Sequence, residues 1–274
     1  MNQMKVEHID HMGNDDSVVN AARVSFAKQA DQYTDDQNAR LIKYLARHNH
    51  WTPFAHAFVT LRFKAPIAIH AQCVKHQVGF AMNTVSRRYV SDEPELFIPE
   101  FRTAPSGSIK QGSGDVFDVM YYACDGSTSI PKICFMSSDK AEVQDFIKAS
   151  DKELFLTSKD RDDLSTAYKQ YAYDSIETYN NLIMLGVAPE QARFVLPQGV
   201  MTEWVWSGSL QAWARFYNQR SDSHAQQEIQ YLAHEVDKIV GALFPVSWEA
   251  LTGSTGAEPT TRRMATLTVP HYNS

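Results

Sequence analysis

The sequence has little cysteine and no long hydrophobic run. Cys73, Cys124 and Cys134 are the only three cysteines in 274 residues. Their number and wide spacing exclude a disulfide framework and a Cys-x-x-Cys metal clamp, and none lies in a known nucleophile context. No stretch reaches the roughly 18 apolar residues that a membrane-spanning helix needs. The first residues, MNQMKVEHIDHMGNDD, lack the basic start and apolar segment of a signal peptide, so we expect a cytoplasmic protein.

An excess of basic residues is also missing. The formal net charge of -6 gives the chain no general attraction to nucleic acid or anionic lipid, so phosphate binding requires a local basic cluster. We therefore expect small phosphate ligands, with neither nucleic acid nor membrane as a partner. The composition, 43% hydrophobic and 21% charged, is typical of a globular protein, and the length suits one well-buried core.

Helical and strand patterns alternate in the first part of the chain. Residues 34–49 begin with cap candidates and carry apolar residues at helical spacing, which predicts an amphipathic helix. Residues 57–64 alternate between apolar and polar, which predicts a half-buried strand. A helix is expected over 67–76, because proline is tolerated where Pro66 precedes it. Its predicted apolar stripe is Ile67, His70, Ala71 and Val74, and its opposite side gathers Gln72, Lys75 and His76.

The middle of the chain loses this periodicity. We interpret residues 103–163 as an insertion or small subdomain, with short strands such as 132–135. Regular patterns then return, and a single domain is expected over 1–251, followed by a loose tail over 252–274. The later elements expected are a helix from 164 to Gly186, a helix restarting at Pro189, a strand at 201–206, a helix capped by Ser209, and a helix through Leu243 begun by a Ser223 and Gln226 capping box.

Two polar segments stand out as candidate sites. KHQVGFAMNTVSRRYV, residues 75–90, places a helix end before a basic loop, and arginine forks match phosphate oxygens. For an isolated Ser-Arg-Arg, a solvated charged loop is the commoner explanation. RSDSHAQQEIQ, residues 220–230, begins with Arg220, whose ordinary role would be to neutralise a helix C-terminus. The spacing of His48, His50 and His56 is irregular for zinc and favours structural histidines.

A series of short motifs occurs in one order along most of the chain. They are AARVSFAK (21–28), HWTPFAH (50–56), FKAPI (63–67), QCVKHQ (72–77), NTVSRRYV (83–90), KQGSG (110–114), ARFVLP (192–197), SLQAWARF (209–216) and RSDSHAQ (220–226). In this succession the chain resembles the flavin-dependent thymidylate synthases, which are unrelated to the cysteine-dependent thymidylate synthase. The resemblance implies an α/β fold in which a mixed sheet is flanked by helices, with 103–163 as an embellishment.

The resemblance also implies an activity, which is reductive methylation of dUMP to dTMP. Methylenetetrahydrofolate would supply the carbon, NADPH the reducing equivalents and FAD the hydride relay, in a homotetramer whose sites are shared between subunits. Arg220 would be catalytic by stabilising negative charge that develops on the uracil, because arginine keeps its proton. No metal site is implied. The substrate-binding residues implied are Gln72, Lys75, Ser86, Arg87, Arg88, Arg193 and Arg220, and the flavin-binding residues are Thr52, Lys75, His76, Gln77, Thr84, Ser209, Leu210, Gln211 and Arg215.

The chain departs from the family's commonest pattern at several of these positions. Lys75-His76-Gln77 replaces Arg-His-Arg, Ser209-Leu210-Gln211 replaces Asn-Leu-Arg, and Thr84 and Ala55 stand where acidic residues are usual. Three alternatives therefore remain open. They are a related dUMP-modifying enzyme with altered one-carbon chemistry, a flavin- or nucleotide-binding homologue without catalysis, and a metal-dependent hydrolase built on His48, His50 and His56.

Overall fold

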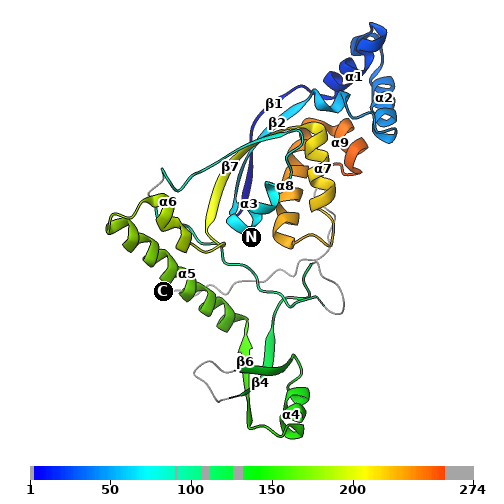
Figure 1. Cartoon of the computed structure of the whole chain (residues 1–274). Coiled ribbons are helices and arrows are strands. Elements are labelled where there is room, and N and C mark those ends of the chain that lie inside the picture. Colours follow the sequence, from blue (N-terminus) through cyan, green and yellow to red (C-terminus); the bar gives the residue numbers. More distant parts are fainter. Residues whose placement is uncertain (1–2, 90–91, 106–111, 126–131, 257–274) are drawn as a thin grey trace, which may run out of the picture.

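The structure is a computed structural model that describes residues 3–89, 92–105, 112–125 and 132–256. The predicted tail beyond Gly256, Val90 and the first two residues of KQGSG lie outside the described residues. Figure 1 shows an upper lobe, where a sheet packs against helices, and a smaller lower lobe. Within the described residues, no helix has the length and apolar character needed to span a membrane.

The main sheet has the strand order β1-β2-β7-β3 and contains segments far apart in the sequence. Its strands are β1 (Lys5–Met12), β2 (Phe58–Pro66), β7 (Met201–Ser209) and β3 (Phe80–Thr84). The expected α/β class is confirmed, but all three strand pairings are antiparallel, so the sheet is not the mixed sheet that was expected. Residues 80–84 form a strand here rather than part of a basic loop.

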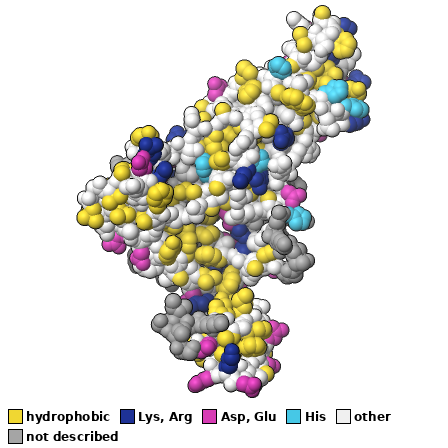
Figure 2. Space-filling view, in the orientation of Figure 1, with side chains coloured by type: hydrophobic (Ala, Val, Ile, Leu, Met, Phe, Trp, Pro, Cys, Tyr) yellow, Lys and Arg dark blue, Asp and Glu magenta, His cyan; other side chains and the backbone are white. Residues whose placement is uncertain are grey.

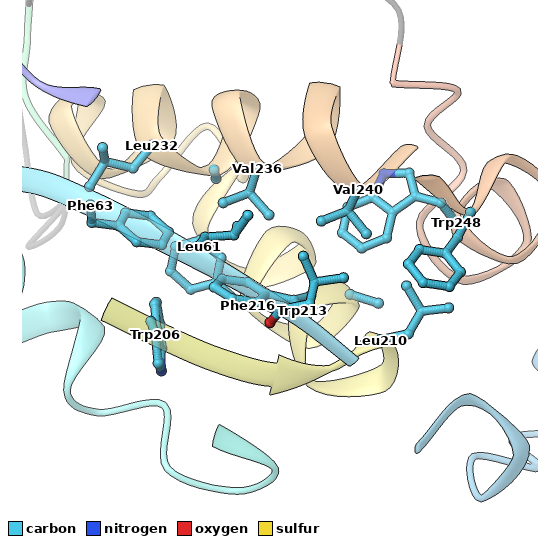
Figure 3. Close-up of a cluster of buried hydrophobic side chains, with 14 of the residues drawn as sticks. Leu61, Phe63, Trp206, Leu210, Trp213, Phe216, Leu232, Val236, Val240 and Trp248 are labelled. Atoms are coloured by element: carbon cyan, nitrogen blue, oxygen red, sulfur yellow. The ribbon is translucent and has the colours of Figure 1, made fainter. Parts of the chain in front are cut away.

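One face of this sheet builds the core. Leu61 and Phe63 on β2 are fully buried beside Trp204 and Trp206 on β7, as the alternation over 57–64 predicts. The Phe63 ring stacks on Trp204 with 5.1 Å between ring centroids. Figure 3 shows these strands under the apolar sides of two helices. The covering helices are α7 (Leu210–Arg220), α8 (Gln227–Leu243) and α9 (Pro245–Thr252).

The N-terminal helices pack at one end of this sheet. They are α1 (Asp15–Arg23) and α2 (Asp35–Arg47), which confirms the amphipathic helix expected over 34–49. The side chain of Thr34 caps α2 by accepting a hydrogen bond from the backbone N–H of Gln37. Three short 3-10 helices lie in the N-terminal part of the chain, at Val24–Phe26, Ala30–Gln32 and Pro53–Ala55. A fourth lies within the ARFVLP motif, at Arg193–Val195.

Two predicted helix details are wrong. Helix α3 (Ile67–Cys73) ends three residues early, and it buries Ile69 and Cys73 rather than the predicted stripe. Pro66 still belongs to β2, so the sheet fixes which side of this short helix faces inward. Ser223 does not begin a capping box either, because α8 starts after Gln226. Asp222 instead closes a turn there, accepting hydrogen bonds from the backbone and the ring of His224.

The predicted insertion contains its own sheet, with strand order β5-β4-β6, and forms the lower lobe in Figure 1. The strand expected over 132–135 is present within it as β5. A stacked contact between Phe135 and Phe146, 4.7 Å between centroids, joins this sheet to its helix. The chain then returns through α5, whose first turn is capped by Asp160. The elements of the lower lobe are β4 (Val119–Asp125), β5 (Lys132–Ser137), α4 (Lys140–Ala149) and β6 (Leu154–Asp160). The helices that follow it are α5 (Arg161–Met184) and α6 (Pro189–Ala192).

Candidate functional site

A pocket of about 330 Å³ lies between the end of α3 and the outer side of α7, and we call it the Arg220 pocket. It brings together residues from three separate motifs. Its lining contains three cationic side chains and no carboxylate, together with the apolar Val78 and Phe80. The predicted site residues that line it are Lys75, His76, Gln77, Arg215 and Arg220.

The guanidinium of Arg220 is held from two sides in this pocket. Its Nε donates a hydrogen bond to Nε2 of His76 at 2.9 Å, and its Nη2 donates to the backbone oxygen of Gln72 at 3.4 Å. The Gln72 side chain in turn donates to Oε1 of Gln226 at 2.6 Å. Residues 144 to 154 positions apart are thereby joined into one polar network.

His76 is neutral in this arrangement. Burial, followed by the charges of Arg220 and Arg215, lowers its pKa from 6.5 to about 4. Because arginine cannot accept a hydrogen bond, Nε2 of His76 must be the acceptor, and the ring proton is on Nδ1. His76 therefore orients Arg220 without adding a second positive charge.

A second pocket, of about 600 Å³, lies between α3 and the strand ends, and we call it the Arg193 pocket. Arg87 and Arg193 both line it, and neither is paired with a carboxylate among the residues that the structure describes. Their guanidinium groups instead donate to backbone oxygens, of Asp92 and of Glu190 respectively. The other cations in the lining are neutralised, by ion pairs Arg62–Glu203 at 2.8 Å and Lys64–Glu95 at 2.5 Å.

The remaining basic loop residues lie beside this pocket. Arg88 forms a half-exposed ion pair with Glu190 at 3.0 Å and lines, together with Arg87, a third pocket of about 310 Å³. The Ser86 hydroxyl accepts a hydrogen bond from the backbone N–H of Arg88. The predicted substrate residues are thus divided. Gln72 and Arg220 belong to one polar network, whereas Arg87, Arg88 and Arg193 line the other two pockets.

The other predicted flavin residues are not gathered in the Arg220 pocket. Thr52 is exposed at the start of a 3-10 turn. Ser209 is buried as the cap of α7, where its hydroxyl accepts from the N–H of Ala212 at 3.2 Å, and Leu210 is fully buried. Oε1 of Gln211 is buried without a hydrogen-bond partner among the described residues. Thr84 lines the Arg193 pocket instead.

One residue of the Arg193 pocket was missed by the sequence analysis. His70 was expected on an apolar stripe of α3, but its ring faces this pocket and its Nε2 lies 2.9 Å from the Thr84 hydroxyl. The sequence contains a usable signal, because a histidine is a polar exception on an otherwise apolar stripe. Its partner, fourteen residues along the chain, cannot be inferred from that position alone.

Cysteine and metal chemistry receive no support from the described residues. Burial raises the pKa of the Cys73 thiol to about 12, so this side chain is not a thiolate near neutral pH. The rings of His48 and His50 lie beside each other with 6.4 Å between centroids. Among the described residues, no group of three or more His, Cys, Asp or Glu side chains is arranged to hold a metal ion.

Comparison with known proteins gives consistent similarities. The family model described as "Thymidylate synthase complementing protein" matches residues 7–246. A flavin-dependent thymidylate synthase of Kosmotoga olearia is 32% identical over 246 residues, covering 88% of this chain and 87% of the relative. The Thermosipho africanus enzyme of the same name is 32% identical over 250 residues, covering 88% of each.

A solved structure shares the fold. It is the crystal structure of the UMP/dUMP methylase PolB from Streptomyces cacaoi bound with 5-Br dUMP, with a TM-score of 0.66. The alignment covers 93% of this chain and 97% of that chain at 22% sequence identity. The similarity extends over nearly the whole chain, so the lower lobe is included in the comparison.

Proposed function

The chain belongs to the flavin-dependent thymidylate synthase family, and from this premise we propose that it catalyses the reductive methylation of dUMP to dTMP. In this proposal methylenetetrahydrofolate supplies the carbon, NADPH is the reductant and FAD is the flavin. The observation that carries the proposal is the Arg220 pocket, where separate family motifs meet around one fixed guanidinium.

The lining of the Arg220 pocket suits a flavin dinucleotide. Lys75 and Arg215 provide positive charge for its phosphates, Gln77 adds neutral hydrogen-bonding groups, and Val78 and Phe80 provide apolar surface. Gln211 lies on the same helix, and its Oε1 is buried without a hydrogen-bond partner among the described residues. When bound, the flavin would supply the hydride that reduces the transferred carbon.

Arg220 would act on the pyrimidine by electrostatics. A guanidinium stays protonated, so it stabilises negative charge that develops on the uracil ring rather than moving a proton. The hydrogen bonds to His76 and to the Gln72 carbonyl fix its plane before substrate binds. Such preorganisation strengthens the stabilisation of a developing charge, because no reorientation is required during the reaction.

The nucleotide phosphate would bind in the Arg193 pocket. Arg87 and Arg193 supply two guanidinium groups that form no ion pair within the described residues, although Asp92 and Glu93 line the same pocket, and Arg88 lies at the neighbouring pocket. The PolB structure contains 5-Br dUMP, which is a ligand of the same chemical class. Ser86 would contact the ligand through its hydroxyl, which accepts a hydrogen bond from the backbone N–H of Arg88.

We further propose that several copies of the chain complete each site, as a homotetramer. Arg220, which donates to the backbone oxygen of Gln72, lines a different pocket from Arg87 and Arg193, so a second copy would bring the two sets to one nucleotide. An apolar surface for such contacts is present. Figure 2 shows hydrophobic side chains gathered over α5 and α6. The exposed hydrophobic residues on or next to these helices include Tyr171, Met184, Leu185 and Phe194, which are 65% to 81% exposed.

An anaerobic turnover assay tests the function directly. Purified protein is incubated with FAD, NADPH, dUMP and methylenetetrahydrofolate, each is omitted in turn, and the nucleotide product is identified by mass. Formation of dTMP only in the complete mixture is the expected result. A product that carries the carbon without the final reduction would identify altered one-carbon chemistry. Binding of flavin and dUMP without any methylated product would identify a homologue without catalysis, consistent with Ala55 and Thr84 at acidic positions.

A further inference from the structure

Two cysteines oppose each other on neighbouring strands of the lower lobe, and neither lines a pocket described above. Strands β4 and β5 are antiparallel, and Ala123 on β4 pairs with Phe135 on β5. The next pair is Cys124 with Ile133, so Cys134 is an extra residue in β5. In a β-bulge of this kind, two residues of one strand oppose a single residue of the other. Cys134 and Ile133 therefore both oppose Cys124.

Both thiols lie on the face of this sheet that helix α4 does not cover. Side chains alternate between the two faces along a strand, and directly opposed residues share a face. Phe135 stacks on Phe146 of α4, so the pair of Ala123 and Phe135 lies on the helix face. Cys124 follows Ala123 and Cys134 precedes Phe135, so both cysteines point to the opposite face.

The two thiols differ in accessibility. Cys124 is only 3% exposed, whereas Cys134 is exposed. Burial, followed by the negative charge of an ionised Cys134, raises the pKa of the Cys124 thiol. The second effect requires the two side chains to be neighbours, in agreement with the strand register. An accessible thiol beside a second cysteine is the arrangement found in redox-sensitive pairs, where one thiol meets the oxidant and the other resolves the product.

Strand geometry brings the pair within reach of a disulfide bond. Opposed residues of antiparallel strands have Cα atoms about 4.5–5.5 Å apart, and a disulfide needs about 4.4–6.8 Å. Because both side chains leave the sheet on one face, the sulfur atoms can meet without a change of strand pairing. Three cysteines are too few for a disulfide framework, but one adjacent pair is enough for a reversible oxidation.

We propose that Cys124 and Cys134 form a reversible oxidation site, in which a hydroperoxide converts the two thiols into a disulfide that ties the edge strand β5 to β4. The peroxide O–O bond breaks on the exposed Cys134, which becomes a sulfenic acid as one water is released. The Cys124 sulfur then attacks the Cys134 sulfur, and its proton leaves with the sulfenic oxygen as a second water. Two thiols and one hydrogen peroxide thus give one disulfide and two waters, and a dithiol reductant reverses the change.

Mass spectrometry on the full-length protein tests the site. Folded, reduced protein is treated with hydrogen peroxide, its remaining thiols are alkylated in denaturant, and it is digested without reduction. The expected product has lost the mass of two hydrogen atoms and yields one cross-linked peptide pair containing Cys124 and Cys134. Dithiothreitol should restore all three thiols. Cys73 is the internal control and should stay reduced, because burial raises its pKa to about 12.

Single variants separate a resolving pair from oxidation of one cysteine. In Cys124→Ser the Cys134 sulfenic acid has no resolving partner, so dimedone should capture it, whereas little should be captured in the wild type. In Cys134→Ser the accessible thiol is missing, and the buried Cys124 should stay reduced. Cys73→Ala is the matched control, since it removes a cysteine outside the lower lobe and should form the same cross-link as the wild type.

Three results would overturn the proposal. The first is a wild type that keeps all three thiols at a peroxide concentration that oxidises Cys134 in Cys124→Ser. The second is a disulfide that joins two chains, seen as a dimer on a non-reducing gel. The third is equal dimedone capture in the wild type and in Cys124→Ser. None of these measurements depends on dUMP or flavin, so their outcome leaves the proposed function untouched.

Discussion

Arg220 donates a hydrogen bond from Nε to Nε2 of His76, 2.9 Å away, although the two residues are 144 positions apart. The contact fixes the proton of His76 on Nδ1 and leaves the only charge on the arginine. It also joins two family motifs that are separate in sequence, at the end of α3 and at the end of α7. The same contact leads to a pH-dependent stability and to a mutational test of the site.

The pKa of His76 predicts a loss of stability in mild acid. Its pKa is about 4 in the folded chain, whereas the ordinary histidine value of 6.5 applies to the unfolded chain. Between these values the unfolded chain binds a proton that the folded chain does not, so stability falls as the pH falls through this window. His76→Gln keeps an oxygen that can accept from Arg220 but does not titrate. The melting temperature of the wild type should therefore decrease more than that of His76→Gln between pH 7 and pH 5.

The difference between the two proteins is the relevant quantity. Other groups that titrate in this range, including His70, are present in both proteins and cancel. Above pH 7 the two melting curves should differ by a constant amount. Parallel changes across the whole range would show that His76 has an ordinary pKa in the folded chain.

Replacement of Arg220 by lysine should reduce turnover far more than flavin content. Lysine keeps a positive charge but loses the planar fork that reaches both His76 and the Gln72 carbonyl. Loss of one preorganised donor of this kind lowers kcat by about 100-fold or more. Flavin content, measured from the visible absorbance of the purified protein, should stay within about twofold, since the arginine acts on the pyrimidine in our proposal.

A matched control is Arg40→Lys. The Nε of Arg40 donates to a backbone oxygen of its own helix, that of Asp36, and this exposed side chain lies in no described pocket. Its turnover should equal that of the wild type. Unchanged turnover in Arg220→Lys as well would remove Arg220 from the mechanism.

Replacement of Arg88 by alanine should chiefly weaken dUMP binding. Its ion pair with Glu190 is half-exposed, so its loss should change the free energy of unfolding by less than about 1 kcal/mol. Loss of a guanidinium that contacts the phosphate should raise the dUMP dissociation constant by about tenfold. Glu190→Gln breaks the same ion pair but keeps the guanidinium, and it should bind dUMP at least as tightly as the wild type. Equal affinities in all three proteins would exclude a phosphate role for Arg88.

Local patterns predicted the elements whose faces differ strongly in polarity. The alternation over 57–64 identified β2, because its inward residues pack under α8 and its outward residues Thr60, Arg62 and Lys64 are polar. The helix expected through Leu243 is present as α8, whose Ile229, Leu232 and Val236 are fully buried against the sheet. Strand β1 was missed, since all but one of its residues are exposed and its pairing with β2 comes from backbone hydrogen bonds rather than from burial.

The candidate site was only partly predictable. The motifs indicated which residues belong to it, but no spacing in the sequence shows that Arg220 meets His76 or that Thr84 meets His70. These contacts depend on how β3 and α3 are placed by the sheet. The Ser223 capping box failed because the Asp222 turn satisfies the same backbone region with a different side chain. Competition of this kind between neighbouring polar residues cannot be decided from their order alone.

A buried ion pair connects the segment before the lower lobe to the start of α8. Nη2 of Arg102 lies 2.7 Å and 2.8 Å from the two carboxylate oxygens of Glu228, and its Nε donates to the hydroxyl of Ser113 at 2.8 Å. The two side chains are only 8% and 4% exposed. Glu228 follows Gln226, whose side chain accepts from Gln72 beside Arg220, so this pair supports the polar network of the site.

Removal of one partner should be far more damaging than removal of both. Arg102→Met leaves the Glu228 carboxylate buried without a counter-ion, which should reduce the free energy of unfolding by about 3–5 kcal/mol. In Arg102→Met with Glu228→Leu, both charges are replaced by apolar groups, and most of this loss should be recovered. Urea unfolding of the wild type and both variants measures the difference. Lys148→Met, which breaks an exposed pair with Asp145 on α4, is the control and should cost less than about 1 kcal/mol. If the double variant is as unstable as the single one, the loss comes from the missing contacts of Arg102 rather than from an unpaired buried charge.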